Sequence, residues 1–557
     1  MTGVQTCALP IYFNNQGKQV TVAINTKIIE VLKSLPLEFK KNIIGAKIDN
    51  SVVGMDTKLK RDCTIDFIDK SDLAGYKMYQ AGLKFIMLAS VKDLYEDAKI
   101  SFDHSIMRGM HITLEVGHNL TDEDIIKIKE RMMMIVREDL PILKMNVLSK
   151  EMVEYYNKKN DLACSANILN VDYELVNLYR LEKYFGYFYM EMPYSTGVCR
   201  HFDVVLLNPK ELVLLFLDEK MSAGVPTYIN YEKVIDCFRS EKTWLSKLNI
   251  SYAYQVNEVV ASGKISDLIR LSELNFDNKI HRVCDDIVLK GSRFVMIAGP
   301  SSSGKTTTCK KIALDLQSRG IKTIALSVDD YFKNRLDTPK LPNGDYDFES
   351  IKAIDVEGLN RDINLLLEGK EVSLPTYNFV LGVREYLGKP VKITENCIIL
   401  LEGLHCLNDN LTPQIANETK YKIYLSPFMP LNIDSNNYIS TTDLRLIRRI
   451  IRDNRTRGHD VSKTIATWKT VRDGEEKYIF PYISTSDVII NTSLVYELGV
   501  LKVFAEPLLY SVRTDSKYYE EARRLINFLK SYFPISSEYI RTDCVLREFI
   551  GGSCFDN

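Results

Sequence analysis

The sequence predicts an α/β protein whose C-terminal half contains a doubly wound parallel sheet. Short apolar runs alternate there with helix-like stretches, which is the pattern of parallel strands joined by helices. The chain has 557 residues, of which 45% are hydrophobic, so it is long enough to bury several cores. In the N-terminal half, shorter β-rich segments predict two further units of different architecture. The strands expected in the parallel sheet are residues 294–298, 323–328, 397–401, 422–425 and 488–491, and the helices are 307–317 and 356–367.

The composition limits the class of protein. The formal net charge is -1 and 26% of the residues are charged, which argues against a disordered chain and against a strongly basic nucleic-acid-binding protein. Eleven cysteines occur without a C-x-x-C pair, so we expect reduced thiols rather than disulfides or a zinc site. The best apolar run, residues 212–217, is far shorter than the roughly 20 residues that cross a bilayer. The sequence therefore predicts a soluble, cytoplasmic protein of about three or four domains.

The first 72 residues divide into a leader and a small module. Residues 1–13 lack the basic region and the long apolar region of a secretory signal. They resemble a translated cloning or sequencing adapter, so we interpret them as a non-native leader outside the fold. Residues 14–72 predict a β-grasp module that resembles the TGS domain of threonyl-tRNA synthetases, with β-rich segments at 19–24, 43–48 and 64–68 and a helix at 26–35.

Residues 73–225 are expected to form an α+β domain. Their first helical segment is similar to the first helix of the editing domain of threonyl-tRNA synthetases. That family carries an H-x-x-x-H pair on this helix, and a later cysteine and histidine complete a metal centre. This chain has Ala81 and Phe85 at the first pair, and Phe188 and Met192 at the second. Because apolar side chains cannot ligate such a metal, we expect the fold to be retained and the editing chemistry to be lost.

The N-terminal half also offers three histidines and a connecting segment. His104, His111 and His118 recur every seven residues, which suggests a metal site. A spacing of seven on one strand alternates faces, however, so we favour ordinary core or surface histidines, and a residual binding role stays open. Residues 226–278 have a helical pattern and predict a connector, which either bridges the two halves or serves as a spacer.

A complete G-x-x-x-x-G-K-[ST] motif follows the first strand of the expected parallel sheet and precedes a helix. Small residues let backbone N–H groups converge on phosphate oxygens, and the start of the helix adds partial positive charge. Lys305 is expected to reach the β- and γ-phosphates of a nucleoside triphosphate, and Thr306 to ligate Mg²⁺. The alternative is a glycine- and serine-rich turn that matches by accident. The expected nucleotide-binding residues are Gly299, Ser301, Ser302, Ser303, Gly304, Lys305, Thr306 and Thr307.

Carboxylates end two of the expected strands. Asp329 and Asp330 follow the strand 323–328, where an acceptor hydroxyl would lie, and phosphorylation of an alcohol needs a base there. We interpret Asp329 as that base and Asp330 as a structural residue, and an acidic cap of the loop is the alternative. Glu402 ends the strand 397–401 in a Walker-B-type arrangement, so we expect it to hold Mg²⁺ directly or through water.

Residues 443–458 form an expected helix that is rich in arginine. A solvated cationic face would explain it. The helix also closely resembles the lid of uridine kinases, and the segment 327–332 resembles the S-x-D-x-[FY]-[FY] element of the uridine kinase and phosphoribulokinase family. The resemblance implies that lid arginines close over the triphosphate and stabilise transferred charge, without separating their individual roles. The candidates are Arg448 and Arg452 for catalysis, Arg449 for the nucleotide and Arg445 for the substrate, with Arg457 nearby.

The same resemblance suggests where an acceptor binds. Asp347 matches the aspartate that holds ribose hydroxyls in the family, and a later segment matches its P-x-Y-D-F-x-x-x-x-R, which makes Tyr377 and Arg384 candidate substrate-binding residues. Two positions depart from the family. Asn378 replaces an aspartate, and Gly382 stands where uridine and cytidine kinases carry a histidine that contacts the base. The resemblance therefore implies recognition of the ribose more firmly than recognition of a base.

These observations predict a kinase domain at residues 279–557 that uses ATP and Mg²⁺ to phosphorylate the ribose 5'-hydroxyl of a nucleoside such as uridine or cytidine. A second hypothesis keeps the kinase and changes the acceptor to a phosphorylated pentose or another small alcohol. A third describes an RNA-binding or regulatory protein whose N-terminal half engages tRNA while the kinase half senses nucleotide, and the near-neutral charge weakens it. The sequence leaves the preferred base, feedback regulation and the oligomeric state open.

Overall fold

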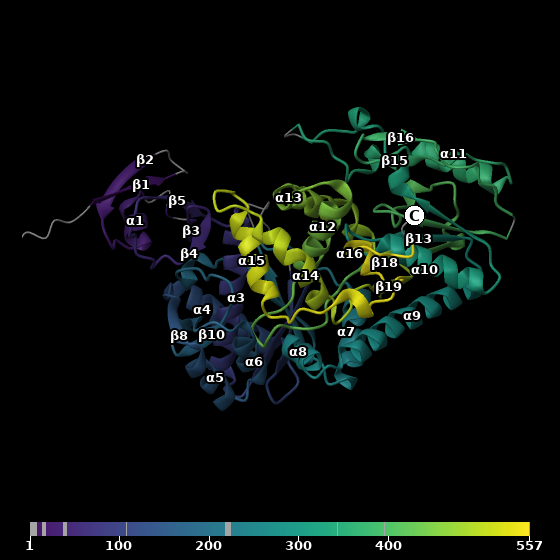
Figure 1. Ribbon diagram of the computed structural model, residues 1–557. Helices are drawn as coiled ribbons and strands as arrows, with labels where there is room; N and C mark the ends of the chain where they lie inside the picture. Colours follow the sequence, from purple (N-terminus) through teal and green to yellow (C-terminus); the bar gives the residue numbers. More distant parts are fainter. Residues whose placement is uncertain are drawn as a thin grey trace, which may run out of the picture.

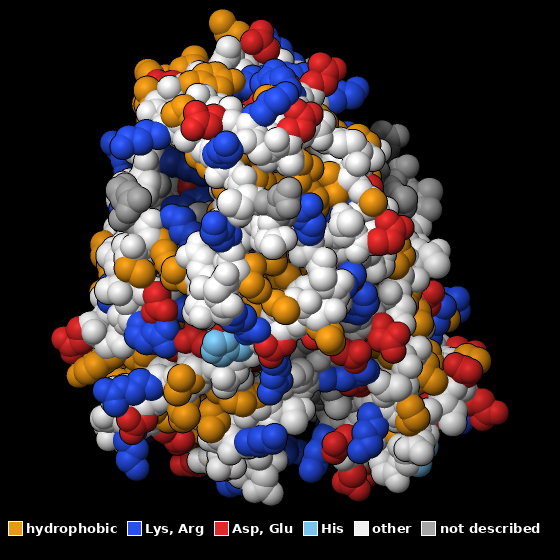
Figure 2. Space-filling view, turned by 90° about the vertical axis from the view of Figure 1, so that its right-hand side faces the viewer, with side chains coloured by type: hydrophobic (Ala, Val, Ile, Leu, Met, Phe, Trp, Pro, Cys, Tyr) orange, Lys and Arg blue, Asp and Glu red, His pale blue; other side chains and the backbone are white. Residues whose placement is uncertain are grey.

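The computed structural model describes residues 8–13, 18–36, 40, 42–106, 109–217, 224–341, 344–394 and 396–555. Figure 1 shows a small sheet at one end of the molecule, the helices and sheets of the N-terminal half next to it, and the parallel sheet at the opposite end. On the face shown in Figure 2, Lys and Arg side chains are interspersed with Asp and Glu side chains, in keeping with the net charge of -1. Among the described residues, no helix is long and apolar enough to span a bilayer.

The N-terminal module is a five-stranded mixed sheet with a helix packed on it. The strand order is β2-β1-β5-β3-β4, in which β1 and β5 are parallel. Ile28, Val31 and Leu32 of the helix are buried with Ile65 and Phe67 of β5, as the predicted β-grasp arrangement requires. The elements are β1 (Ala8–Phe13), β2 (Lys18–Ala23), α1 (Ile28–Ser34), β3 (Gly45–Ile48), β4 (Ser51–Val53) and β5 (Cys63–Ile68).

One prediction for this module is wrong. Residues 8–13, which we assigned to a leader outside the fold, form β1 and fill the place between β2 and β5. The strand pairs antiparallel with β2 from Ala8 opposite Ala23 to Phe13 opposite Lys18, and parallel with β5 on its other edge. The prediction failed because it rested on comparisons with signal peptides and adapter sequences. Strand pairing depends instead on residues that are distant in the chain. The remaining leader residues, 1–7, lie outside the described part of the chain.

The next unit is an α+β domain built around one long, largely buried helix, α3. The Asp72 side chain caps the start of α3 by accepting hydrogen bonds from the backbone of Ala74 and Gly75. Two antiparallel sheets, β11-β12-β7-β6 and β10-β9-β8, complete the domain. The elements are α3 (Leu73–Leu94), β6 (Lys99–Ile106), β7 (Gly109–Glu115), α4 (Asp122–Glu138), β8 (Leu143–Leu148), α5 (Ser149–Lys158), α6 (Leu162–Val171), β9 (Leu175–Leu181), β10 (Tyr184–Tyr187), β11 (Phe202–Asn208) and β12 (Glu211–Phe216).

The predicted doubly wound sheet is confirmed. Its five strands are all parallel, in the order β14-β17-β13-β18-β19. The central strand β13 sends Val295 and Ile297 into one core and Phe294 and Met296 into another, so both faces are covered. The elements are β13 (Phe294–Ala298), α10 (Lys305–Ser318), β14 (Thr323–Ser327), α11 (Val356–Leu367), β15 (Thr376–Asn378), β16 (Val383–Glu385), β17 (Ile398–Glu402), β18 (Lys420–Ser426), α12 (Thr441–Arg457), α13 (Val461–Tyr478), β19 (Val488–Asn491), α14 (Glu497–Tyr510), α15 (Tyr519–Leu529) and α16 (Arg547–Ile550).

Three helices connect the halves: α7 (Glu232–Lys247), α8 (Ala253–Ala261) and α9 (Ile265–Lys290). Leu268, Ile280 and Ile287 of α9 are buried in the same core as Ile297 of β13. These helices are therefore part of the C-terminal core and not a spacer. The boundary that the sequence predicted after residue 278 falls inside α9, which runs unbroken to residue 290.

The two halves meet through buried polar contacts. Lys77 of α3 pairs with Glu521 of α15 at 3.1 Å. Elsewhere, the Asn167 amide of α6 donates to the Asp434 carboxylate at 2.8 Å. Asn167 and Asp434 are buried, and Lys77 and Glu521 are largely shielded from solvent, so both contacts help to fix the orientation of one half on the other.

Candidate active site

The phosphate loop connects β13 to α10 with a backbone that glycine makes possible. Gly304 has φ 83°, in the left-handed region, and begins α10. A Cβ added at Gly299 would lie 2.5 Å from the Leu425 carbonyl oxygen. The side-chain oxygens of Ser302 and Ser303 are buried without a hydrogen-bond partner among the described residues. Such a loop, at the start of a 14-residue helix, is suited to bind phosphate oxygens.

Glu402, at the end of β17, lies directly beside this loop. Its Oε1 accepts hydrogen bonds from the hydroxyls of Thr306 at 3.1 Å and Ser327 at 3.2 Å. Burial raises the pKa of Glu402 from 4.5 to about 7, Asp329 raises it further, and the Lys305 ammonium opposes the shift. Carboxylate and hydroxyl oxygens are the ligands that Mg²⁺ prefers, so Thr306 and Glu402 together fit the predicted metal site.

The two aspartates after β14 have different surroundings. Asp330 accepts a hydrogen bond from the backbone N–H of Tyr377 at 3.0 Å, and burial raises its pKa. The predicted structural role of Asp330 agrees with this contact. Asp329 is only partly buried and contributes to the electrostatic environment of Glu402 and Arg457. Its side chain is therefore available at the edge where the phosphate loop opens.

The arginines of α12 fall into two groups. Arg445 and Arg448 are almost completely buried and pair with Glu475 and Glu497, respectively. Arg445 also donates to the carbonyl oxygen of Ser301 at 2.9 Å, and Arg448 to that of Ser302 at 3.4 Å. Both therefore support the phosphate loop from behind, in positions that differ from the substrate contact predicted for Arg445 and the catalytic role predicted for Arg448.

Arg449 and Arg452 form the second group, beside the first two on the same side of α12. The Arg449 guanidinium donates to the Ser301 hydroxyl at 3.2 Å, and both arginines pair with Asp453. Arg457 stacks over the ring of Phe379 with 5.0 Å between the guanidinium carbon and the ring centre. Because residues three and four apart share a face, all four arginines lie on one side of the helix. The two groups differ in their partners, which are Glu475 and Glu497 for the first and Asp453 for the second.

On the acceptor side, the predicted residues are held by other protein groups. The Arg384 guanidinium pairs with Asp355 at 2.7 Å, and the Asp347 carboxylate accepts from the Tyr478 hydroxyl at 3.3 Å. Tyr377 is buried, and its hydroxyl has no hydrogen-bond partner among the described residues.

The position that departs from the family, Gly382, has a structural explanation. It has φ 73°, and an added Cβ would lie 2.8 Å from the Arg335 guanidinium. The Arg335 side chain thus occupies the space beside this glycine, and it donates to the Phe379 carbonyl oxygen at 2.9 Å.

Sequence reasoning missed three residues that contact or surround the site. Glu548, from α16, accepts hydrogen bonds from the backbone N–H and the hydroxyl of Thr307 at 3.1 and 2.8 Å. The Thr492 hydroxyl donates to the Ser303 carbonyl oxygen at 2.6 Å. Glu349 is half-buried, and burial, with Glu475 nearby, raises its pKa to about 7. None of the three lies in a recognisable motif, and only the fold brings them to the loop.

The four positions that the sequence aligned with editing-centre ligands belong to the core. Ala81, Phe85, Phe188 and Met192 are all buried, and the rings of Phe85 and Phe188 have their centres 5.4 Å apart. Within the described residues, no cluster of three or more His, Cys, Asp or Glu side chains forms a metal-binding group.

The structure also shows where His104, His111 and His118 lie. His104 and His111 lie on neighbouring strands and stack with 4.7 Å between ring centres, whereas the sequence analysis had assumed a single strand. His118 pairs with Asp124. The first two histidines are therefore core residues, and the third belongs to the start of α4.

Comparisons with known proteins relate the two halves of the chain to different groups of proteins. Residues 294–496 match the sequence model of the Phosphoribulokinase / Uridine kinase family. A uridine kinase of Schizosaccharomyces pombe is 31% identical over 201 residues, which are 36% of this chain and 40% of that protein. A threonine–tRNA ligase of Natranaerobius thermophilus is 27% identical over 145 residues, which are 26% of this chain and 23% of the ligase.

A solved structure described as a possible uridine kinase from Bacillus stearothermophilus is 19% identical, with a TM-score of 0.27, and the match covers 39% of this chain and 100% of the other. The chain spans about two fifths of the uridine kinases and about a quarter of the ligases that it matches. Residues 294–496 are thus similar to the Phosphoribulokinase / Uridine kinase family, and the N-terminal half is similar to threonine–tRNA ligases.

Proposed function

We propose that this protein is an ATP- and Mg²⁺-dependent kinase that transfers the γ-phosphate of ATP to the 5'-hydroxyl of a nucleoside such as uridine or cytidine. The observation that carries the proposal is the convergence of three chemical groups at the carboxyl edge of one parallel sheet. The phosphate loop follows β13, Asp329 follows β14, and Glu402 ends β17. Ligands of open parallel sheets bind at this edge.

Each group has a role in phosphoryl transfer. The phosphate loop and Lys305 would hold the triphosphate, and Asp329 would accept the proton of the attacking hydroxyl. Mg²⁺, held by Thr306 and Glu402, would neutralise charge on the phosphates. Such a reaction asks the protein mainly for positioning and electrostatic stabilisation, which these residues supply.

The arginines of α12 divide this work. Arg449 and Arg452, on the side of the Ser301 hydroxyl, are the candidates that contact the triphosphate. Arg445 and Arg448 are positioning residues, because they hold the carbonyl oxygens of the loop and are neutralised by buried glutamates. This assignment replaces the earlier expectation that all four face the ligand.

A specific observation supports a second acceptor class. The Arg335 guanidinium lies beside Gly382, where a base-contacting histidine stands in uridine and cytidine kinases. A fixed cation there would favour an acceptor with a negative group, such as a sugar phosphate. Asp347 and Tyr377 stay candidate contacts for the sugar in either case.

A coupled assay of ADP release tests the proposal on the full-length protein, with panels of nucleosides, sugars and sugar phosphates. The full chain is needed because a fragment that starts at residue 279 would cut α9 and expose the core that it covers. Turnover with uridine or cytidine is expected. Turnover with sugar phosphates alone would favour the second acceptor class, and inactivity with every nucleoside would overturn the first.

A further inference from the structure

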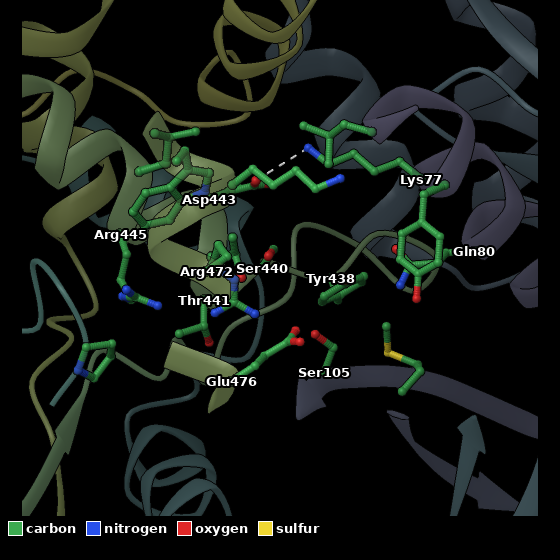
Figure 3. A pocket seen from close by; sticks show the side chains of 18 of the residues that line it. Lys77, Gln80, Ser105, Tyr438, Ser440, Thr441, Asp443, Arg445, Arg472 and Glu476 are labelled. Atoms are coloured by element: carbon green, nitrogen blue, oxygen red, sulfur yellow. Dashed lines mark ion pairs between the residues drawn. The ribbon is translucent and has the colours of Figure 1, made fainter. Parts of the chain in front are cut away.

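A cavity of about 490 Å³ lies between the two halves of the chain. Figure 3 shows Lys77 and Gln80 of α3 on one side of it, and Asp443 and Arg445 of α12 on the other. Its volume is within the range of small-molecule sites, and neither Lys305 nor Asp329 lines it. The cavity reaches Pro300 of the phosphate loop and Arg445, and it extends away from the candidate catalytic groups.

Most basic side chains in its wall are neutralised by neighbouring carboxylates. Lys77 pairs with Glu521 at 3.1 Å and Arg524 with Asp443 at 2.7 Å. Arg445 and Arg472 share Glu475. These pairs complete the wall of the cavity and leave little net charge on it.

Lys84 differs from these residues. It lines the cavity with only 6% of its surface exposed, and no carboxylate of the described residues lies within 4.0 Å of its ammonium. The ammonium faces aromatic rings instead, with the centres of Tyr438, Phe102 and Phe188 at 5.0, 5.8 and 5.9 Å. Burial lowers the pKa of Lys84 to about 8, and the more distant Asp434 opposes the shift. A buried cation without a counter-ion is costly, so an anion in the cavity would be stabilised there.

We propose that this cavity binds a small aromatic anion, whose negative group pairs with Lys84 and whose apolar body packs against Phe188, Tyr189 and Tyr438. The three rings line the same cavity as the ammonium. Aromatic walls favour flat apolar groups, and a single buried cation selects for one negative charge. This proposal does not depend on the kinase assignment, because neither Lys305 nor Asp329 lines the cavity.

Two fluorescent probes test it on the full-length protein. 8-Anilinonaphthalene-1-sulfonate carries an aromatic body and one negative charge, and N-phenyl-1-naphthylamine has the same rings without the charge. We expect one saturable site for the anionic probe, weakened at least tenfold by Lys84→Met. The control Lys127→Met removes an exposed charge from the same domain and should leave the site unchanged.

Binding of the neutral probe should not weaken in Lys84→Met, which separates loss of the charge pair from collapse of the cavity. Circular dichroism of each variant checks folding. Absence of a saturable site for the anionic probe, or equal affinity in Lys84→Met and the wild type, would overturn the proposal.

A second, independent observation concerns the phosphate loop. In P-loop proteins, backbone N–H groups of the loop and the helix start donate to phosphate oxygens. Here the N–H and hydroxyl of Thr307 both donate to the Glu548 carboxylate. The same segment places Val545 over the loop, where an added Cβ on Gly304 would lie 2.4 Å from its side chain. Arg455 of α12 donates to the Glu548 carbonyl oxygen at 3.0 Å and holds the segment in place.

We infer that the C-terminal segment 541–555 is a strap that competes with nucleotide, with the Glu548 carboxylate in the place of a phosphate. The inference rests on the proposed function, because it assumes that the loop binds ATP. Binding of ATP would displace Glu548 from Thr307, and repulsion between this carboxylate and the phosphates would drive the exchange.

Calorimetric titration of ATP into Glu548→Gln, the wild type and the control Glu538→Gln tests the strap. The first variant loses only the negative charge. The control removes the charge of Glu538, an exposed glutamate that lies just before the segment. We expect ATP to bind about tenfold more tightly to Glu548→Gln and equally to the other two proteins. Equal or weaker binding by Glu548→Gln would overturn the strap. Absence of ATP binding in all three proteins would instead overturn the proposed function.

Discussion

The two halves of this chain differ in the side chains that occupy the positions singled out in the sequence. In the C-terminal half, Lys305, Asp329 and Glu402 remain polar at the edge of the parallel sheet, although burial raises the pKa of Glu402 to about 7. In the N-terminal half, the positions of Phe85 and Phe188 are filled by rings that pack together. Buried polar groups cost stability and are typical of functional sites, whereas packed apolar side chains carry neither that cost nor polar chemistry.

Asp329→Asn should have the largest effect. Loss of the base is expected to lower turnover about 10³-fold, or about 4 kcal/mol in the activation barrier, because the amide cannot accept the proton. ATP affinity should change little, since the phosphate loop is intact. Steady-state kinetics and nucleotide titration measure the two quantities. Equal loss of both would contradict the role of Asp329.

Arg448→Met sharpens the comparison within the C-terminal half. It leaves Glu497 buried without its partner, so we expect the free energy of unfolding to fall by about 3–5 kcal/mol. Arg449→Met, which removes the donor to the Ser301 hydroxyl, should lower turnover with little change in stability. Urea unfolding and steady-state kinetics of both variants distinguish a residue that holds the phosphate loop in place from one that contacts the triphosphate. Wild-type stability of Arg448→Met would contradict a stabilising role for the Arg448–Glu497 pair.

Phe85→Ala tests the N-terminal half. The substitution leaves a cavity beside Phe188, and we expect the free energy of unfolding to fall by about 3 kcal/mol. Below the unfolding transition, kcat and KM should match the wild type, because this core does not touch the phosphate loop. A changed kcat at full occupancy would instead show that the halves are coupled in catalysis.

The pH dependence of stability should show the smallest effect. The pKa of Glu402 rises from 4.5 to about 7 on folding, so the folded protein binds more protons there and loses stability as the pH rises between these values. The contribution is about 3 kcal/mol, and Glu349 behaves in the same way. Glu402→Gln should remove about half of the loss between pH 5 and pH 8 in urea unfolding. An unchanged pH profile would contradict a buried, protonated Glu402.

Local sequence was sufficient for elements whose signals lie within a few residues. The phosphate loop and the parallel strands were predicted because turn residues and apolar runs act locally. The strand at residues 8–13 was missed, since its partners lie on β2 and β5. The boundary after residue 278 was misplaced because α9 extends into the core that it covers.

By itself, the sequence determined the fold class of the C-terminal half and the chemical groups at its strand ends, because periodicity and motif spacing are properties of short segments. Only the tertiary structure decided which arginines of α12 face the phosphate loop and which pair with Glu475 and Glu497 behind it. It alone placed Glu548 on Thr307 and opened a cavity around Lys84 between the halves. These arrangements join residues that are far apart in the chain, and their energies depend on burial and on partners that no local pattern encodes.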